Sequence, residues 1–300
     1  MTGLRNHAGP MVGLDSIERG IAWPIVYASV FGAPVRASRL WSSIVGVAAS
    51  EDEMRAALSG PALQSLLVEV DGLIWLRGAD GAEARQGFAR REGATRDLLH
   101  RNRAVLEFVK GLRGVRFAAL SGGCAHDAAE DGDIDVFVVT EKNAVWRTLL
   151  WSTLVAKARG WRRILCLNYL VDTTALALPG RDFYGGFELT SLRAIKGEEV
   201  YGEILAANLW AASMFPNFFQ SRPHGQNPGD RIPTGSGRHL LEATARMIHR
   251  PYLRHRLPEG AGVELSDHVV RLHATDHRTR LRGLFQDALL KAGVEAPPWI

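Results

Sequence analysis

The stretch VRFAALSGGCAHDAAEDGDIDVFVVT, residues 115–140, decides how we expect this chain to fold. Its first part, Val115–Leu120, is the apolar run of a buried strand and ends in Ser121-Gly122-Gly123. A helix-sized segment follows from Cys124, and after a second turn Asp133–Thr140 is apolar enough for another strand. This order of strand, glycine turn, helix and strand predicts a place where the backbone closely approaches a ligand.

The second strand opens with two acidic residues in alternation. Asp133 and Asp135 are two positions apart, so on a strand their carboxylates lie on the same face. Two neighbouring carboxylates repel each other unless a cation lies between them, and Mg²⁺ with substrate phosphates suits such a pair. The amides at the start of the helix after Gly122-Gly123 favour an anion such as phosphate.

Together these residues resemble the signature of a known superfamily. Gly122-Gly123, nine intervening residues and Asp133-Ile134-Asp135-Val136 are similar to the motif of the polymerase-β-like nucleotidyltransferases. The wider layout resembles a bacterial branch of that superfamily, in which a winged-helix-like segment precedes the transferase core. Weaker similarity to that branch lies in the stretches Cys166–Leu170, Ala207–Trp210 and Phe215–Asn217.

The resemblance implies a reaction and the residues that perform it. Asp133 and Asp135 would be catalytic and hold Mg²⁺ or Mn²⁺, and Ser121, Gly122 and Gly123 would bind the phosphates of a nucleoside triphosphate (NTP). A nucleoside monophosphate would pass to an acceptor nucleophile, and pyrophosphate would leave. The sequence does not indicate whether the acceptor is a small molecule, a protein or an RNA.

The superfamily often supplies a third carboxylate from a later strand, and here the expected strand is Ile164–Val171. Asn168 stands where that carboxylate is expected, so we count it among the nucleotide-binding candidates. Asp172 lies at the end of the strand, about 13 Å further along, and is the third catalytic candidate. An amide takes no proton at neutral pH, so without Asp172 nearby the site binds metal and nucleotide but lacks a strong base.

We therefore expect an α+β chain with a nucleotidyltransferase-type mixed sheet and flanking helices over 95–218. A winged-helix-like module is expected over 20–80, a linker or mobile loop over 219–237, and a helical segment over 238–300. The first module rests on three helical stretches followed by a hairpin at Asp71-Gly72. Winged helices often bind DNA, but acidic residues at 51–53 open the third helix and repel phosphate, which favours a packing role.

Composition sets wider limits on function. The chain has 300 residues and a net charge of +4, and its two cysteines are too few for a disulfide framework or a four-cysteine zinc site. No stretch is apolar for long enough to span a bilayer, so we expect a cytoplasmic protein without a membrane partner.

The most basic part of the chain, residues 85–116, carries nine positive and three negative side chains, a net charge of +6. Either a solvated helix face or a phosphate-attracting surface accounts for it, so nucleic acid remains a candidate partner through the basic helices. Two other functions stay open beside the transferase. One is a catalytically degenerate nucleotide sensor or nucleic-acid-associated regulator on the same fold, and the other is a partner-binding module without nucleotide.

Overall fold

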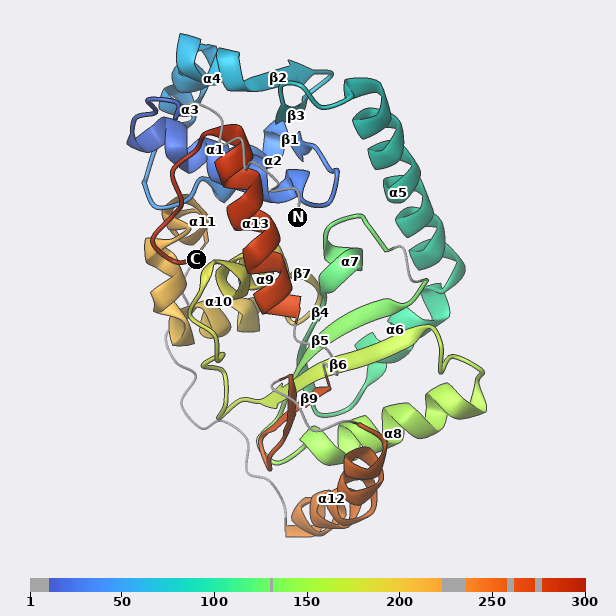
Figure 1. Cartoon of the computed structure of the whole chain (residues 1–300). Helices are drawn as coiled ribbons and strands as arrows, with labels where there is room; N and C mark the ends of the chain where they lie inside the picture. Colours follow the sequence, from blue (N-terminus) through green and yellow to red (C-terminus); the bar gives the residue numbers. More distant parts are fainter. Residues whose placement is uncertain (1–10, 130–131, 223–235, 258–261, 273–276) are drawn as a thin grey trace, which may run out of the picture.

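The computed structural model describes residues 11–129, 132–222, 236–257, 262–272 and 277–300. Within these ranges the chain is an α+β protein with one three-stranded sheet and one six-stranded mixed sheet (Figure 1). The smaller sheet and its helices come from the N-terminal part of the chain, and the larger sheet carries the residues singled out above. No helix in the described ranges has the length and apolar character needed to cross a bilayer.

The N-terminal module, residues 16–76, contains the expected helices and hairpin. The hairpin turns at Asp71 and Gly72, whose φ angles of 55° and 71° are those of a turn with left-handed central residues. Ser50 and Glu53 form the capping box that begins the third helix. The elements are α1 (Ser16–Ser29), β1 (Val35–Arg36), α2 (Ala37–Ser43), α3 (Glu51–Ser59), α4 (Pro61–Leu66), β2 (Leu67–Val70) and β3 (Leu73–Leu76).

This module does not stand apart from the rest of the chain. Most of its buried apolar side chains belong to the same apolar cluster as one face of the large sheet. Asn217, fully buried in α11 (Pro216–Gln220), accepts a hydrogen bond from the amide of Ala49 and donates one to the carbonyl of Trp41. Because the core is continuous, the boundary near residue 80 separates sequence segments and not separate cores.

The basic stretch connects the two sheets along the chain. It forms the long helix α5 (Gly81–Arg101) and the shorter α6 (Arg103–Gly111), which lead from the N-terminal module to the large sheet (Figure 1).

The large sheet has its strands in the order β7-β4-β5-β6-β9-β8. Only β5 and β6 run parallel, and the other neighbours are antiparallel. The strands are β4 (Val115–Leu120), β5 (Ile134–Thr140), β6 (Leu165–Asp172), β7 (Arg193–Lys196), β8 (Val263–Leu265) and β9 (Val269–Leu272).

Helices cover both faces of this sheet, because alternate residues of its central strands are apolar on both sides. Val136 and Val138 pack with α6 and α8 (Val145–Ala158) on one face. Phe117 and Phe137 face the opposite layer, where α9 (Phe183–Ser191) and α10 (Glu198–Ala207) lie; the 3-10 turn η1 (Leu209–Ser213) leads from α10 to α11.

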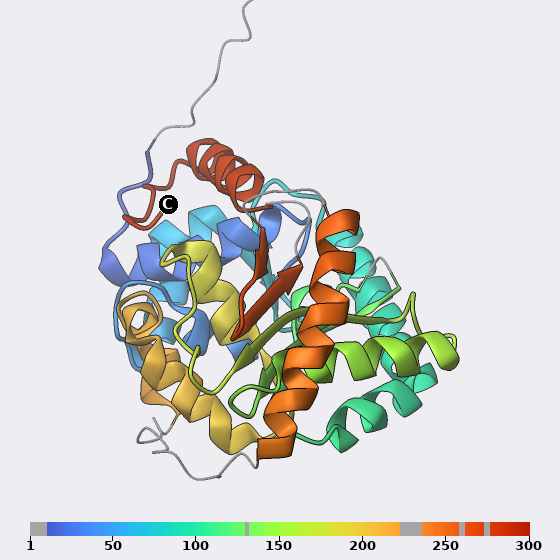
Figure 2. The same ribbon diagram turned by 90° about the horizontal axis from the view of Figure 1, so that it is seen from below.

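The C-terminal segment is not purely helical, in contrast to the sequence-based expectation. After α12 (Ser236–Arg256), β8 and β9 form a hairpin that extends the large sheet beyond β6. The last helix, α13 (His277–Ala292), returns to pack on α1 of the N-terminal module (Figure 2). Short apolar runs such as these gain stability as strands because β6 offers an unpaired edge.

The helix α12 lies across α8 and caps it (Figure 2). The buried carboxylate of Glu242 accepts hydrogen bonds from the amides of Trp146 and Arg147, at 2.7 and 2.9 Å. A negative charge at a helix N-terminus satisfies amides that have no partner inside the helix. The expected linker at 219–237 falls mostly on 223–235, which lie outside the described residues.

Candidate metal and nucleotide site

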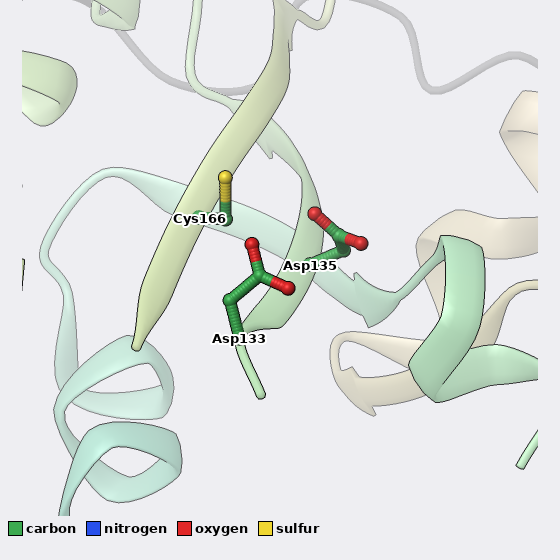
Figure 3. Close-up of side chains that lie close together, drawn as sticks. All are labelled: Asp133, Asp135 and Cys166. Atoms are coloured by element: carbon green, nitrogen blue, oxygen red, sulfur yellow. The ribbon is translucent and has the colours of Figure 1, made fainter. Parts of the chain in front are cut away.

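The two aspartates lie together where β5 begins (Figure 3). Asp133 immediately precedes the strand and Asp135 is its second residue, so both carboxylates project from the same face, as predicted. The parallel register places Cys166 of β6 beside Asp135. One ligand atom from each of these three side chains lies within 4.8 Å of the others, and all three residues are half-buried.

The glycine turn packs directly against this acidic group. Gly122 has a φ of +51°, and a Cβ at this position would lie 2.8 Å from Oδ2 of Asp135. A Cβ on Gly123 would lie 2.8 Å from the carbonyl oxygen of Ala128. Both glycines are therefore required by close approach, and the amide of Ser121 ties the turn to β5 through the carbonyl of Asp135 at 3.1 Å.

The helix expected after the turn is only one turn long. It is α7 (Gly122–Ala125), and the chain leaves helical geometry at His126. Asp127, with a φ of 55°, then holds the guanidinium of Arg193 at 2.5 Å. So short a helix has little dipole, so the sequence-based expectation that its N-terminus favours an anion is weakened.

The side chain of Asn168 forms a hydrogen bond with Asp135. Its Nδ2 donates to Oδ1 of Asp135 at 2.7 Å, and its Oδ1 accepts from the thiol of Cys166 at 2.8 Å. These two contacts fix the orientation of the amide and hold the carboxylate in place. Asn168 thus lies beside Asp135 and orients its carboxylate, while its expected part in nucleotide binding stays a prediction.

Cys166 is the residue that sequence reasoning missed. Its only signal is that it shares strand parity with Asn168, which does not show which residue of β5 it faces. Burial, followed by the negative charges of Asp135 and Asp133, raises the pKa of the Cys166 thiol to about 12. Burial likewise raises the pKa of Cys124 to about 11, so without a cation both cysteines are neutral thiols and weak nucleophiles at pH 7.

Asp172 is not part of this group, which corrects the expectation that it is a third catalytic carboxylate. It pairs with Thr140 at the far end of β5, six residues and about 20 Å along the strand from Cys166. Its carboxylate is fully buried and accepts hydrogen bonds from the amides of Asn143 and Thr174 and from the Thr174 hydroxyl. Nδ1 of His268 lies 2.7 Å from its Oδ2.

The structural role of Asp172 leads to a prediction. Asp172→Asn replaces one of the two accepting oxygens by an NH2 group, which would face groups that also donate. We therefore expect the free energy of unfolding to fall by about 1–3 kcal/mol. Divalent-cation binding at Asp133 and Asp135 should not change. Urea unfolding measures the first effect, and calorimetric titration with Mn²⁺ measures the second. A loss of cation binding in the folded variant would show that Asp172 does contribute to the metal site.

The basic stretch 85–116 exposes much of its charge. Arg91 is tied to the carbonyl of Gly32 and Arg85 to the carboxylate of Asp71. Exposed positive side chains on α5, α6 and the loop after them are Arg90, Arg96, Arg101, Arg103, Lys110 and Arg113.

Comparisons of the chain with protein-family models, with curated proteins and with solved structures found no match.

Proposed function

We propose that the protein is a divalent-metal-dependent nucleotidyltransferase. It transfers a nucleoside monophosphate from an NTP to an acceptor nucleophile and releases pyrophosphate. The proposal rests on one observation, the packing of the glycine turn against the carboxylate pair, in which a Cβ on Gly122 would lie 2.8 Å from Oδ2 of Asp135. Phosphates bound at the turn would thus lie beside the cation that the aspartates hold.

The arrangement of elements supports the same function. The resemblance to polymerase-β-like nucleotidyltransferases implies a strand, a glycine turn, a helix and a second strand, and the chain has β4, the turn, the one-turn helix α7 and β5 in this order, followed by α8 and β6. The aspartates lie where β5 begins, and the turn at Gly122 packs against one side of the group. A nucleotidyltransferase-type mixed sheet is therefore part of the proposal.

Each residue has a distinct task in this reaction. Asp133 and Asp135 fit a divalent ion that also binds phosphate oxygens, since Mg²⁺ commonly takes one or two carboxylates and substrate phosphates. The ion, when bound, neutralises charge on the phosphates. Asn168 holds Asp135 in position, and Gly122 lets the backbone of the turn pack against Asp135, where a side chain would collide, so that phosphate bound at the turn would lie beside the ion.

The site also favours a second candidate function. In the part of the chain that the structure describes, the metal-binding group contains two carboxylates and a thiol, with an amide beside them. A third carboxylate that would take the proton of the acceptor is replaced by Cys166 and Asn168. A nucleotide sensor that binds NTP without transfer would need no such base.

The test is a thermal-unfolding series with ATP, GTP, CTP and UTP, each with and without Mg²⁺. At a hundredfold excess over the dissociation constant, the correct nucleotide should stabilise the fold by about 2.7 kcal/mol. We expect Asp135→Asn to abolish this stabilisation and Asp172→Asn, a matched change in the same sheet, to retain it. If all four nucleotides fail to stabilise the folded parent, the proposal is wrong.

Pyrophosphate release then separates the two candidates. Release in the presence of small-molecule, protein or RNA acceptors supports the transferase. Nucleotide binding without release in that panel supports the sensor. The exposed arginines of α5 and α6 make RNA the first acceptor to try, and binding through them should weaken steeply with salt.

A further inference from the structure

The third side chain of the acidic group is a thiol, and this affects which metal the group prefers. Mg²⁺ requires oxygen ligands in near-octahedral geometry, which Asp133 and Asp135 supply and Cys166 does not. Thiolate sulfur suits zinc-like transition ions, which also accept carboxylate oxygen. The side chains therefore fit Mg²⁺ at two positions and disagree with it at the third.

The three ligand atoms are near enough to hold one ion. Zinc binds sulfur at about 2.3 Å and carboxylate oxygen at about 2.0–2.2 Å, so in tetrahedral geometry two of its ligands lie about 3.5 Å apart. The atoms of Asp133, Asp135 and Cys166 already lie within 4.8 Å of one another. Side-chain rotations that move them by less than about 1 Å would bring all three onto one ion.

The register between β5 and β6 brings these three side chains together. Cys166 is the parallel partner of Asp135, and Asn168 contacts both side chains, at 2.8 Å from the sulfur and 2.7 Å from Oδ1. Figure 3 shows the three side chains directed toward a common space. Three protein ligands with a further position left for substrate is the pattern of catalytic zinc sites.

We propose that Cys166 is a third metal ligand and that the site prefers a thiophilic divalent ion, Zn²⁺ above all, to Mg²⁺. Coordination forms a sulfur–metal bond and releases the thiol proton to solvent, one proton for each ion bound. The open position would take a phosphate oxygen of the nucleotide. That last step rests on the proposed function, whereas the metal preference does not.

Cobalt(II) is the direct probe, because a cobalt–thiolate bond produces an intense charge-transfer band in the near ultraviolet. The full chain titrated with Co²⁺ should show this band, and Cys166→Ser should lose it. The matched control is Cys124→Ser, which should retain the band. Cys124 is the only other cysteine in the chain; it is buried in the apolar core, and its sulfur lies 3.4 Å from the carbonyl oxygen of Asp133.

Metal affinities provide a second readout. We expect Cys166→Ser to weaken Zn²⁺ binding at least about tenfold and to change Mg²⁺ binding by less than about threefold. Cys166→Asp, which supplies a third carboxylate, should strengthen Mg²⁺ binding and weaken Zn²⁺ binding. Competition with a chromogenic chelator measures the Zn²⁺ constants, and calorimetry measures those for Mg²⁺.

The outcomes separate this proposal from the proposed function. Cobalt bound without a thiolate band, or a band that Cys124→Ser removes and Cys166→Ser retains, overturns the assignment of Cys166 and leaves nucleotide transfer untouched. A thiolate band in a protein that no nucleotide stabilises would confirm the metal site and contradict the proposed transferase activity.

Discussion

Gly122→Ala should lower the proposed nucleotidyl transfer by about a hundredfold or more while the protein stays folded. The new methyl group would lie 2.8 Å from Oδ2 of Asp135, closer than nonbonded carbon and oxygen approach, so the carboxylate or the turn must move. A displacement of about 1 Å in a group that positions substrate costs on the order of a hundredfold in rate. Initial rates of pyrophosphate release, with the nucleotide-dependent thermal shift, measure the effect.

The control for Gly122→Ala is Gly160→Ala. Gly160 also has a positive φ, +72°, but a Cβ there has no atom within 4 Å. Alanine in this backbone region costs about 1–2 kcal/mol, so both variants should lose at least that much stability, and Gly122→Ala should lose more because of its contact with Asp135. Only Gly122→Ala should lose nucleotide binding. Equal losses of activity in the two variants would mean that backbone strain, and not contact with Asp135, determines the effect.

Asn208→Ala should reduce the free energy of unfolding by about 3–5 kcal/mol. Asn208 is fully buried at the end of α10 and satisfies four backbone or side-chain groups. Truncation would leave these groups without a partner in the core, where each buried unsatisfied group costs about 1–3 kcal/mol. Its Nδ2 donates to the carbonyls of Leu176 and Ile204, and its Oδ1 accepts from the amide of Leu178 and the indole of Trp210.

Asn102→Ala is the comparison for this stability prediction. Asn102 is half-buried between α5 and α6, and its side chain donates to the carbonyl of Leu98 at 2.8 Å. We expect a loss of less than about 1.5 kcal/mol, because water can replace that contact. Urea unfolding with an unchanged slope would measure both variants. Similar midpoints for the two would show that the network around Asn208 contributes little.

Local patterns in the sequence were sufficient to predict several elements. The apolar run Val115–Leu120 forms β4 with those bounds, and Ile164–Val171 forms β6 shifted by one residue. The Ser50–Glu53 capping box and the Asp71-Gly72 turn are both present, because each depends on residues within three positions of one another. The same locality brought Asp133 and Asp135 to one face of a strand.

Other features depend on contacts between distant segments. The short runs at 263–265 and 269–272 become strands because the edge of β6 accepts them, which no local pattern shows. The buried amides of Asn208 and Asn217 are likewise determined by the backbone groups that surround them, and those come from three parts of the chain.

The same distinction between local and long-range determinants applies to the candidate site. The sequence alone determined the glycine turn and the aspartate pair, since close backbone approach and strand alternation are properties of adjacent residues. Tertiary structure alone decided that Cys166 lies beside Asp135, and the same register places Asp172 beside Thr140 at the opposite end of β5. Strand periodicity shows which face a side chain occupies, but its neighbour depends on the register between strands, which the packing of the whole sheet sets.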